Sequence, residues 1–284
     1  MNNPKSAAIK LAAYMTLLSF ALLPATGMAQ PKRVQRVSNA QQMVSAIRNG
    51  IRIELEPGTY NLSSVREERD MSYIRWEPGS ENKTVTVHDV TDLQIVGVGQ
   101  GEHRIIVSPR DVFVLAFENC KNVTLENITF GHDPIGGECF DGVLRFFNSM
   151  NIVVRKCDLF GCGTEGLSIE GVNGFLFEKS SIRDCNAGIM TVSNGNNLKF
   201  VKSAFFNNKE SYSFQFTESN QVTFTDCVIA GNESKGPLFD LTNCGLIKLT
   251  GGFIILNDVT QLTNQSRSMM FDDVNMKNAI SPKG

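Results

Sequence analysis

The sequence has little of what sugar-binding platforms usually use, since it contains one Trp and four Tyr among 284 residues. Its charge excess is also small, with a formal net charge of -2 and an isoelectric point of about 6.0. That balance excludes the strongly basic surface by which many proteins bind nucleic acids or membrane surfaces. No Cys-x-x-Cys pair is present, so the sequence supports neither a zinc site of that kind nor a thioredoxin-like site.

The apolar content is sufficient for a folded protein with a continuous core. Hydrophobic residues make up 42% of the chain, and 19 of the residues are Phe. This composition excludes a chain that is disordered throughout. The length allows either one large domain or two ordinary ones.

The N-terminal segment has the pattern of an export signal. Two Lys precede an apolar run over 11–23, which is too short to span a bilayer. Small residues then favour cleavage before Gln30, so we expect a signal peptide over 1–29 and a single domain over 30–284. A membrane anchor at the N-terminus is the alternative. No second apolar run of ~18 residues follows, so we expect no membrane span after cleavage and a periplasmic or secreted protein.

A short apolar pattern repeats along the rest of the chain, most clearly over 85–257. It consists of two apolar-x-apolar segments, and the second segment begins at Val123, Ile152, Phe175, Leu198, Val222 and Ile247, at intervals of 29, 23, 23, 24 and 25 residues. Within each segment, apolar and polar residues alternate as they do in β-strands. Strands this short bury their apolar side only when they stack on one another, which predicts a solenoid.

Stacking of the repeats predicts columns of equivalent residues. One inward column contains Leu115, Leu144, Leu167, Met190, Phe214 and Phe239, and a second contains Phe130, Leu159, Ile182, Phe205, Ile229 and Ile254. Asn recurs at the turns, where it tolerates a left-handed backbone and can hydrogen-bond to the next coil through its amide. One turn column contains Asn119, Asn148, Asn194 and Asn243, and another contains Asn208, Asn232 and Asn257.

These features resemble a right-handed parallel β-helix of the pectate-lyase-like superfamily. The stretch IRIELEPGTYNLS over 51–63 resembles its first strand and turn, and LQIVGVGQG over 93–101 resembles the following coil. The resemblance implies an all-β solenoid of about eight coils, with an amphipathic helix over 38–49 capping its N-terminal end. It implies no single reaction, because the superfamily contains lyases, hydrolases, esterases, epimerases and adhesive proteins.

One coil is longer than the others and holds most of the candidate site. The segment GHDPIGGECFDG over 131–142 makes this coil about six residues longer than its neighbours, and function in repeat proteins often lies at such a departure. Arg145 follows on an outward strand position, and Glu165 follows in the next coil. The candidate catalytic residues are therefore His132, Glu138, Asp141, Arg145 and Glu165.

Three chemistries fit these residues, and the sequence leaves them open. β-Elimination of a uronate needs a base, which would be His132 or Glu165, and a cation such as Arg145 to neutralise the carboxylate. Glycoside hydrolysis needs two carboxyl groups, drawn from Asp133, Glu138, Asp141 and Glu165. A Ca²⁺ site that includes Asp133 is the third option; we expect no other cofactor. The alternative without chemistry is an exposed loop whose polar residues are solvated.

The signatures that would assign a reaction are missing. The sequence has no RxxRxP stretch as in pectate lyases, no paired aspartates or GHG as in polygalacturonases, and no carboxylate pattern of pectin esterases. The first prediction is therefore a lyase or hydrolase acting on acidic polysaccharide. The alternative is a non-catalytic envelope or surface protein that binds glycan or protein along one face of its β-helix.

The cysteines are seven in number, so at least one stays free or pairs between chains. Cys162 and Cys185 continue the column of Asn208 on adjacent coils, and stacked strands lie about 4.8 Å apart, close to disulfide reach. We predict a disulfide between them, with Cys139 as another possible partner of Cys162. The alternative is an internal thiol ladder in which Cys157 and Cys227 fill small spaces in the core.

Overall fold

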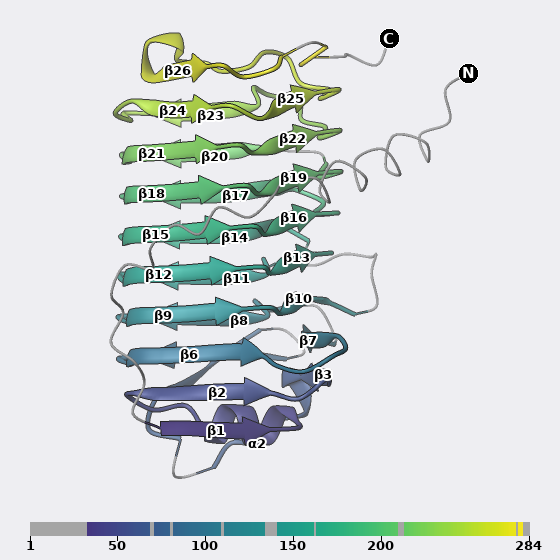
Figure 1. The fold of residues 1–284 in the computed structure, drawn as a ribbon, viewed down its shortest axis with the longest axis vertical. Helices are drawn as coiled ribbons and strands as arrows, with labels where there is room; N and C mark the ends of the chain where they lie inside the picture. The colour runs from purple at the N-terminus through teal and green to yellow at the C-terminus, as the bar shows by residue number, and fades with distance from the viewer. Residues whose placement is uncertain are drawn as a thin grey trace, which may run out of the picture. The chain divides into compact units, whose positions relative to one another are not determined.

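A computed structural model describes residues 33–68, 71–79, 82–108, 111–133, 141–161, 163–209, 213–276 and 278–280. The chain divides into two compact units, Met1–Gln30 and Pro31–Gly284, and every described residue belongs to the second. The predicted signal peptide lies outside the described residues. The second unit consists mainly of short strands that stack coil upon coil along one axis (Figure 1).

Three sheets run along this stack. In spatial order from the N-terminal end, sheet A contains β1 (Arg33–Val37), β2 (Ile51–Leu55), β6 (Thr91–Gly97), β9 (Lys121–Glu126), β12 (Met150–Arg155), β15 (Asn173–Glu178), β18 (Asn196–Val201), β21 (Asn220–Thr225), β24 (Ile247–Thr250) and β26 (Met269–Asp272). Sheet B contains β3 (Gly58–Asn61), β7 (His103–Val107), β10 (Thr129–His132), β13 (Asp158–Phe160), β16 (Ser181–Arg183), β19 (Ala204–Phe206), β22 (Val228–Ala230) and β25 (Phe253–Ile255).

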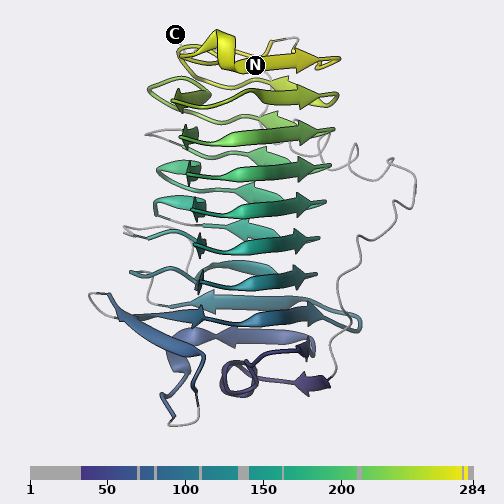
Figure 2. The same ribbon diagram turned by 90° about the vertical axis from the view of Figure 1, so that its left-hand side faces the viewer.

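Sheet C completes each coil. It contains β4 (Ile74–Pro78), β5 (Lys83–His88), β8 (Leu115–Glu118), β11 (Leu144–Phe147), β14 (Glu165–Glu170), β17 (Gly188–Ser193), β20 (Phe214–Thr217) and β23 (Phe239–Thr242). Through most of the chain, three successive strands enter three different sheets, so that each coil adds one strand to each sheet (Figures 1 and 2). Among the described strands, all neighbours pair in parallel except β4 and β5. The predicted all-β parallel β-helix is confirmed.

The strand register confirms the predicted inward columns. Leu144 pairs with Leu115 on one side and with Leu167 on the other, and the column continues to Phe239. The Phe side chains stack inside, with ring centroids of Phe214 and Phe239 4.7 Å apart. Full burial of such a side chain contributes about 1.5–3 kcal/mol, so the stacked aromatic rings are a main source of stability.

The Asn columns adopt the predicted turn geometry. Asn119, Asn148 and Asn194 have positive φ angles of 53°, 46° and 52°, a conformation that Asn tolerates better than most residues. In the column of Asn208, all three amides are buried. The Asn208 side-chain amide donates to Oδ1 of Asn232 at 2.9 Å, and the amide of Asn232 donates to Oδ1 of Asn257 at 2.9 Å. These bonds tie one coil to the next.

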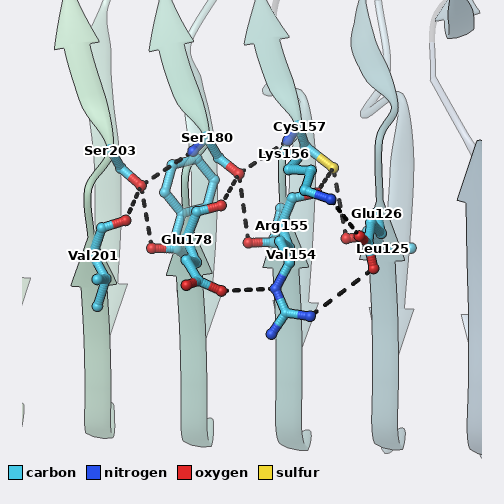
Figure 3. Close-up of polar contacts among 11 residues, drawn as sticks. Leu125, Glu126, Val154, Arg155, Lys156, Cys157, Glu178, Ser180, Val201 and Ser203 are labelled. Carbon is cyan, nitrogen blue, oxygen red and sulfur yellow. Dashed lines mark hydrogen bonds and ion pairs between the residues drawn. The ribbon is translucent and has the colours of Figure 1, made fainter. Parts of the chain in front are cut away.

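A second ladder of polar side chains follows the turn after sheet A (Figure 3). The Cys157 backbone N–H donates to Oγ of Ser180 at 3.0 Å, and the Ser180 N–H donates to Oγ of Ser203 at 3.2 Å. Cys157 and Cys227 are buried and free, as the interpretation of these two residues as core fillers predicts. Burial raises the pKa of both thiols to about 12.

The N-terminal helix is shorter than predicted. α2 covers Ala40–Ser45 instead of 38–49, because Asn39 caps its first turn by accepting the Gln42 N–H at 2.9 Å, and Asn49 is held by the next coil through the Thr91 N–H at 2.7 Å. The helix lies beside β1 at the N-terminal end of the stack (Figure 1). Met43 and Val44 are buried in the core. Two 3-10 turns, η1 (Leu62–Ser64) and η2 (Ser266–Ser268), complete the described helical residues.

The C-terminal end also has a regular last strand. This strand is β26, which pairs with β24 through Ile247 and Met269. None of the described helices is both long and apolar enough to cross a membrane.

Candidate functional site

The outward face of sheet C holds the candidate site. Arg145 on β11 pairs with Ala116 on β8 and with Ser168 on β14, and the column continues through Thr191, Gln215 and Asp240, as the repeat predicts. Inward residues on both sides of each of these positions are fixed in the core. The backbone of the stacked strands therefore sets where each outward side chain begins.

Arg145 is held in place by two neighbours. Its guanidinium forms an ion pair with Glu77 on β4, and its Cζ lies 5.2 Å from the centre of the Phe113 ring. The aromatic face attracts the cation and limits its movement. Arg145 is therefore a positioned cation, with 31% of its side chain exposed.

The antiparallel pair β4 and β5 supplies residues that the repeat could not indicate. Arg75 on β4 pairs with Glu77 at 2.9 Å and also with Glu118 on β8. Burial by itself would raise the pKa of Glu77, but the hydrogen bonds from Arg75 and Arg145 and the charge of Arg145 together lower it. The available signal was Pro78-Gly79 between two alternating stretches, which is typical of a turn between paired strands.

Asp141 has the opposite electrostatic environment. Burial raises the pKa of this carboxyl group, Arg145 partly opposes the effect, and the charges of Asp111 and Glu77 add to it. The pKa values of two neighbouring carboxyl groups are thus shifted in opposite directions, that of Glu77 down and that of Asp141 up. Such a divergence is typical of acid–base sites.

Glu165 lies at the start of β14 and is only 8% exposed. Its Oε1 accepts a hydrogen bond from the Thr191 hydroxyl at 3.4 Å. The strand that carries it packs closely against the chain before β11, where the Val143 N–H donates to the Glu165 carbonyl at 3.0 Å. A Cβ atom on Gly142 would lie 2.4 Å from that carbonyl oxygen and 2.8 Å from the Phe113 ring. Glycine is required for this close approach.

A shallow depression of about 170 Å³ lies on the same face. Its polar side chains come from three adjacent strands, β14, β17 and β20, and they are Ser168, Glu170, Thr191, Ser193, Gln215 and Thr217. Hydroxyl, amide and carboxylate groups can all hydrogen-bond to sugar hydroxyls. Thr191 links the depression to Glu165.

His132 is buried at the end of β10. It pairs in register with the inward residue Val107, is 0% exposed, and its Nε2 lies 2.9 Å from the Val112 carbonyl oxygen. In this structure the ring is part of the interior. The sequence could not distinguish the two placements, because the inserted segment interrupts the alternation after Phe130. Glu138 lies outside the described residues.

Asp133 lies on the side of sheet B. Its carboxylate is 3.6 Å from the guanidinium of Arg104, so an Arg side chain supplies a positive charge beside it. Within the part of the chain that the structure describes, no three His, Cys, Asp or Glu side chains are grouped in a way that could hold a metal ion.

Cys185 forms a disulfide bond. Its predicted partner Cys162 lies outside the described residues, as does Cys139, so the pairing stays a prediction. Cys185 lies beneath the site, because a Cβ atom on Gly166 would be 3.4 Å from its Sγ. Cys120, Cys157, Cys227 and Cys244 are free.

Comparisons with solved structures return proteins of low sequence identity. Pectate lyase Pel9A is 12% identical with a TM-score of 0.47, covering 87% of this chain and 78% of its own. The Family 28 exopolygalacturonase of Yersinia enterocolitica is 10% identical with a TM-score of 0.33, covering 80% and 59%. The periplasmic alginate epimerase AlgG is 9% identical with a TM-score of 0.34, covering 86% and 72%. A search of curated protein sequences gives no significant match.

A family profile matches more than half of the chain. Residues 113–264 match the family described as "Right handed beta helix region", and these residues include every coil from β8 to β25. The match agrees with the parallel sheets and the register of the inward columns. The chain therefore belongs to the right-handed β-helix family.

Proposed function

We propose that the chain binds a polysaccharide along the outward face of sheet C and hydrolyses a glycosidic bond there. The observation that supports this best is the pair of carboxyl groups near Arg145 whose environments differ, since the pKa of Asp141 is raised and that of Glu77 is lowered. A raised pKa favours the protonated form that a general acid needs. The polar depression beside Glu165 supplies hydrogen-bonding groups for the sugar.

Asp141 is the proposed general acid, and Glu165 is the proposed general base. Asp141 gives its proton to the glycosidic oxygen as the bond to the anomeric carbon breaks, and Glu165 takes a proton from the water that attacks this carbon. Arg145 and Glu77 position and tune Asp141 from one side. Asp141 thus loses one proton while Glu165 gains one, so the total charge of the two carboxyl groups does not change.

The charge of the face favours a neutral glycan over the acidic one that the sequence predicts. Among the described side chains on or beside sheet C, the cationic groups of Arg75, Lys83 and Arg145 are outnumbered by the carboxyl groups of Glu77, Glu118, Asp141, Glu165, Glu170 and Asp240. Both Arg side chains also form ion pairs with Glu77. A polyanion would therefore meet repulsion along most of this face.

A panel of soluble glycans tests this proposal. We expect new reducing ends from a neutral polysaccharide, such as xylan or a β-glucan, and no ultraviolet-absorbing unsaturated product from polygalacturonate or alginate. Asp141→Asn and Glu165→Gln should each lower the rate by about 100-fold or more. Asp240→Asn is the matched control, because it removes a carboxylate from the same column at β23. Unsaturated product would favour a lyase, and no turnover of any glycan would contradict the enzymatic proposal.

Binding without catalysis is the second candidate. It is favoured by Ser168, Thr191 and Gln215, three neutral polar side chains that line the depression on three successive strands. Calorimetric titration with the same glycans would then detect binding that Gln215→Ala weakens, while no product forms. The two candidates differ only in whether product forms. The same glycans, tested for binding and for product, therefore distinguish them.

A further inference from the structure

The two edges of sheet A lie at opposite ends of the stack. β1 is the strand at the N-terminal edge and β26 is the strand at the C-terminal edge (Figures 1 and 2). Within the described ranges, no strand pairs with the outer edge of either one. Each edge therefore has backbone N–H and C=O groups that a further parallel strand could pair with.

The register of sheet A connects the two edges position by position. Val34 on β1 pairs with Arg52, and the same outward column continues strand by strand to Met270 on β26. Arg36 begins the second outward column, which ends at Asp272. Each column therefore has one end on β1 and the other on β26.

The ends of the first column are both apolar and exposed. Val34 is 61% exposed and Met270 is 44% exposed. Exposed apolar residues that occur singly are common. These two, however, occupy equivalent positions on the two edge strands, so adding one edge to the other would cover both side chains.

The ends of the second column carry opposite charges. Arg36 pairs with Glu54 at 3.3 Å, and Asp272 pairs with Lys248 at 3.0 Å. Inside the sheet, the same face contains an alternating ladder in which Arg155 contacts Glu178 at 2.7 Å and Glu126 at 4.0 Å (Figure 3). A basic residue next to Asp272 would form the same kind of cross-strand ion pair, and β1 of another copy provides Arg36 at that position.

We propose that the chain associates head to tail, with β1 of one copy adding to β26 of the next as a further parallel strand. The register then places Val34 against Met270 of the neighbouring copy and Arg36 beside Asp272 of that copy. The two surfaces are different, so the contact is heterologous and leaves a free edge at each end. The assembly therefore grows with concentration instead of stopping at a dimer.

Sedimentation equilibrium of the full chain over a range of concentrations tests this proposal. We expect the weight-average mass to rise beyond that of two chains, and to fall at high salt because salt screens exposed charge pairs. Arg36→Asp or Asp272→Arg should weaken association by about tenfold, since each places like charges side by side. The double variant Arg36→Asp/Asp272→Arg should restore it, because the pair is then re-formed with reversed signs.

Lys199→Asp is the matched control. It makes the same change in charge as Arg36→Asp, on the same outward face but on β18 in the middle of the sheet, and it should leave association unchanged. Circular dichroism would confirm that each variant is folded. A mass that stays at one chain, a mass that stops at two chains, or a double variant that associates no better than the single ones would overturn the proposal. The glycan assay concerns the proposed site on sheet C. Its outcome is therefore independent of whether the chains associate through sheet A.

Discussion

The side-chain amide of Asn232 donates to Oδ1 of Asn257 at 2.9 Å, and both residues are completely buried. The Asn232 amide also donates to the Phe205 carbonyl at 3.0 Å, and its Oδ1 accepts from the Asn208 backbone N–H at 3.2 Å. One side chain thus satisfies groups on the coil before it and the coil after it. Buried polar groups are stable in a core only when they are paired in this way.

Replacing Asn232 with Ala should therefore destabilise the stack strongly. It leaves a buried carbonyl and a buried N–H without their partners, for a loss of about 3 kcal/mol in the free energy of unfolding. Urea denaturation measures this loss. Asn196→Ala is the control, because Asn196 bonds to Asn173 at the exposed surface and should cost less than about 0.5 kcal/mol. Equal losses in the two variants would contradict a structural role for the buried ladder.

The fold could be predicted because its determinants repeat. A single inward position such as Phe130 says little, but six equivalent positions at nearly constant spacing fix the register of a whole sheet. The same holds for the turn Asn residues, because each position needs the same left-handed backbone. The helix boundaries were wrong because they depend on single capping contacts at Asn39 and Asn49, which have no repeated counterpart.

The candidate site was predictable only where it follows the repeat. Arg145 falls on an outward position of a regular strand, so its placement follows from the column. His132 follows the last regular residue before the insertion, and alternation alone could not decide whether it faces the core. Glu77 lies on a strand that pairs antiparallel, outside the repeat, and it reaches Arg145 through a long-range contact that no sequence spacing encodes.

Gly142 should be essential for the geometry of the site. A methyl group there would overlap the Glu165 carbonyl, whose position is fixed by the Val143 N–H. We expect Gly142→Ala to cost about 1–3 kcal/mol in stability and to lower any activity that depends on Glu165. Thermal unfolding and the glycan assay measure the two effects. Gly236→Ala is the control, since the nearest atom to a Cβ there is 3.9 Å away.

The cysteines predict a simple pattern of thiol reactivity. Cys185 is disulfide-bonded, so two of the seven cysteines are oxidised and the unfolded, unreduced chain should show five free thiols. In the folded protein, burial raises the pKa of the Cys120 thiol to about 11 and of Cys157 to about 12, so both should react slowly with a thiol reagent. Seven thiols without reduction would contradict the bond, and peptide mapping would identify whether Cys162 is the partner.

Asp141 and Glu77 should give opposite dependences of stability on pH. The folded pKa of Asp141 is raised, so its contribution is fully present below its ordinary value of 3.8 and is lost as the pH rises through the folded pKa. Asp141→Asn should therefore be more stable than the parent chain at neutral pH, with no such gain below pH 3.8. Because Asn cannot act as the proposed proton donor, the same variant should lose activity. Stability and activity should therefore change in opposite directions.

Glu77 is the matched carboxyl group, because its pKa is shifted in the opposite direction to that of Asp141. Its folded pKa is lowered, so its contribution is present above its ordinary value of 4.5 and is lost as the pH falls through the folded pKa. Glu77→Gln should therefore destabilise the chain at neutral pH, and the difference should shrink in acid. Urea unfolding of both variants across this range measures the two slopes. Slopes of the same sign would contradict the opposed environments of Asp141 and Glu77, and with them the support for Asp141 as the proton donor.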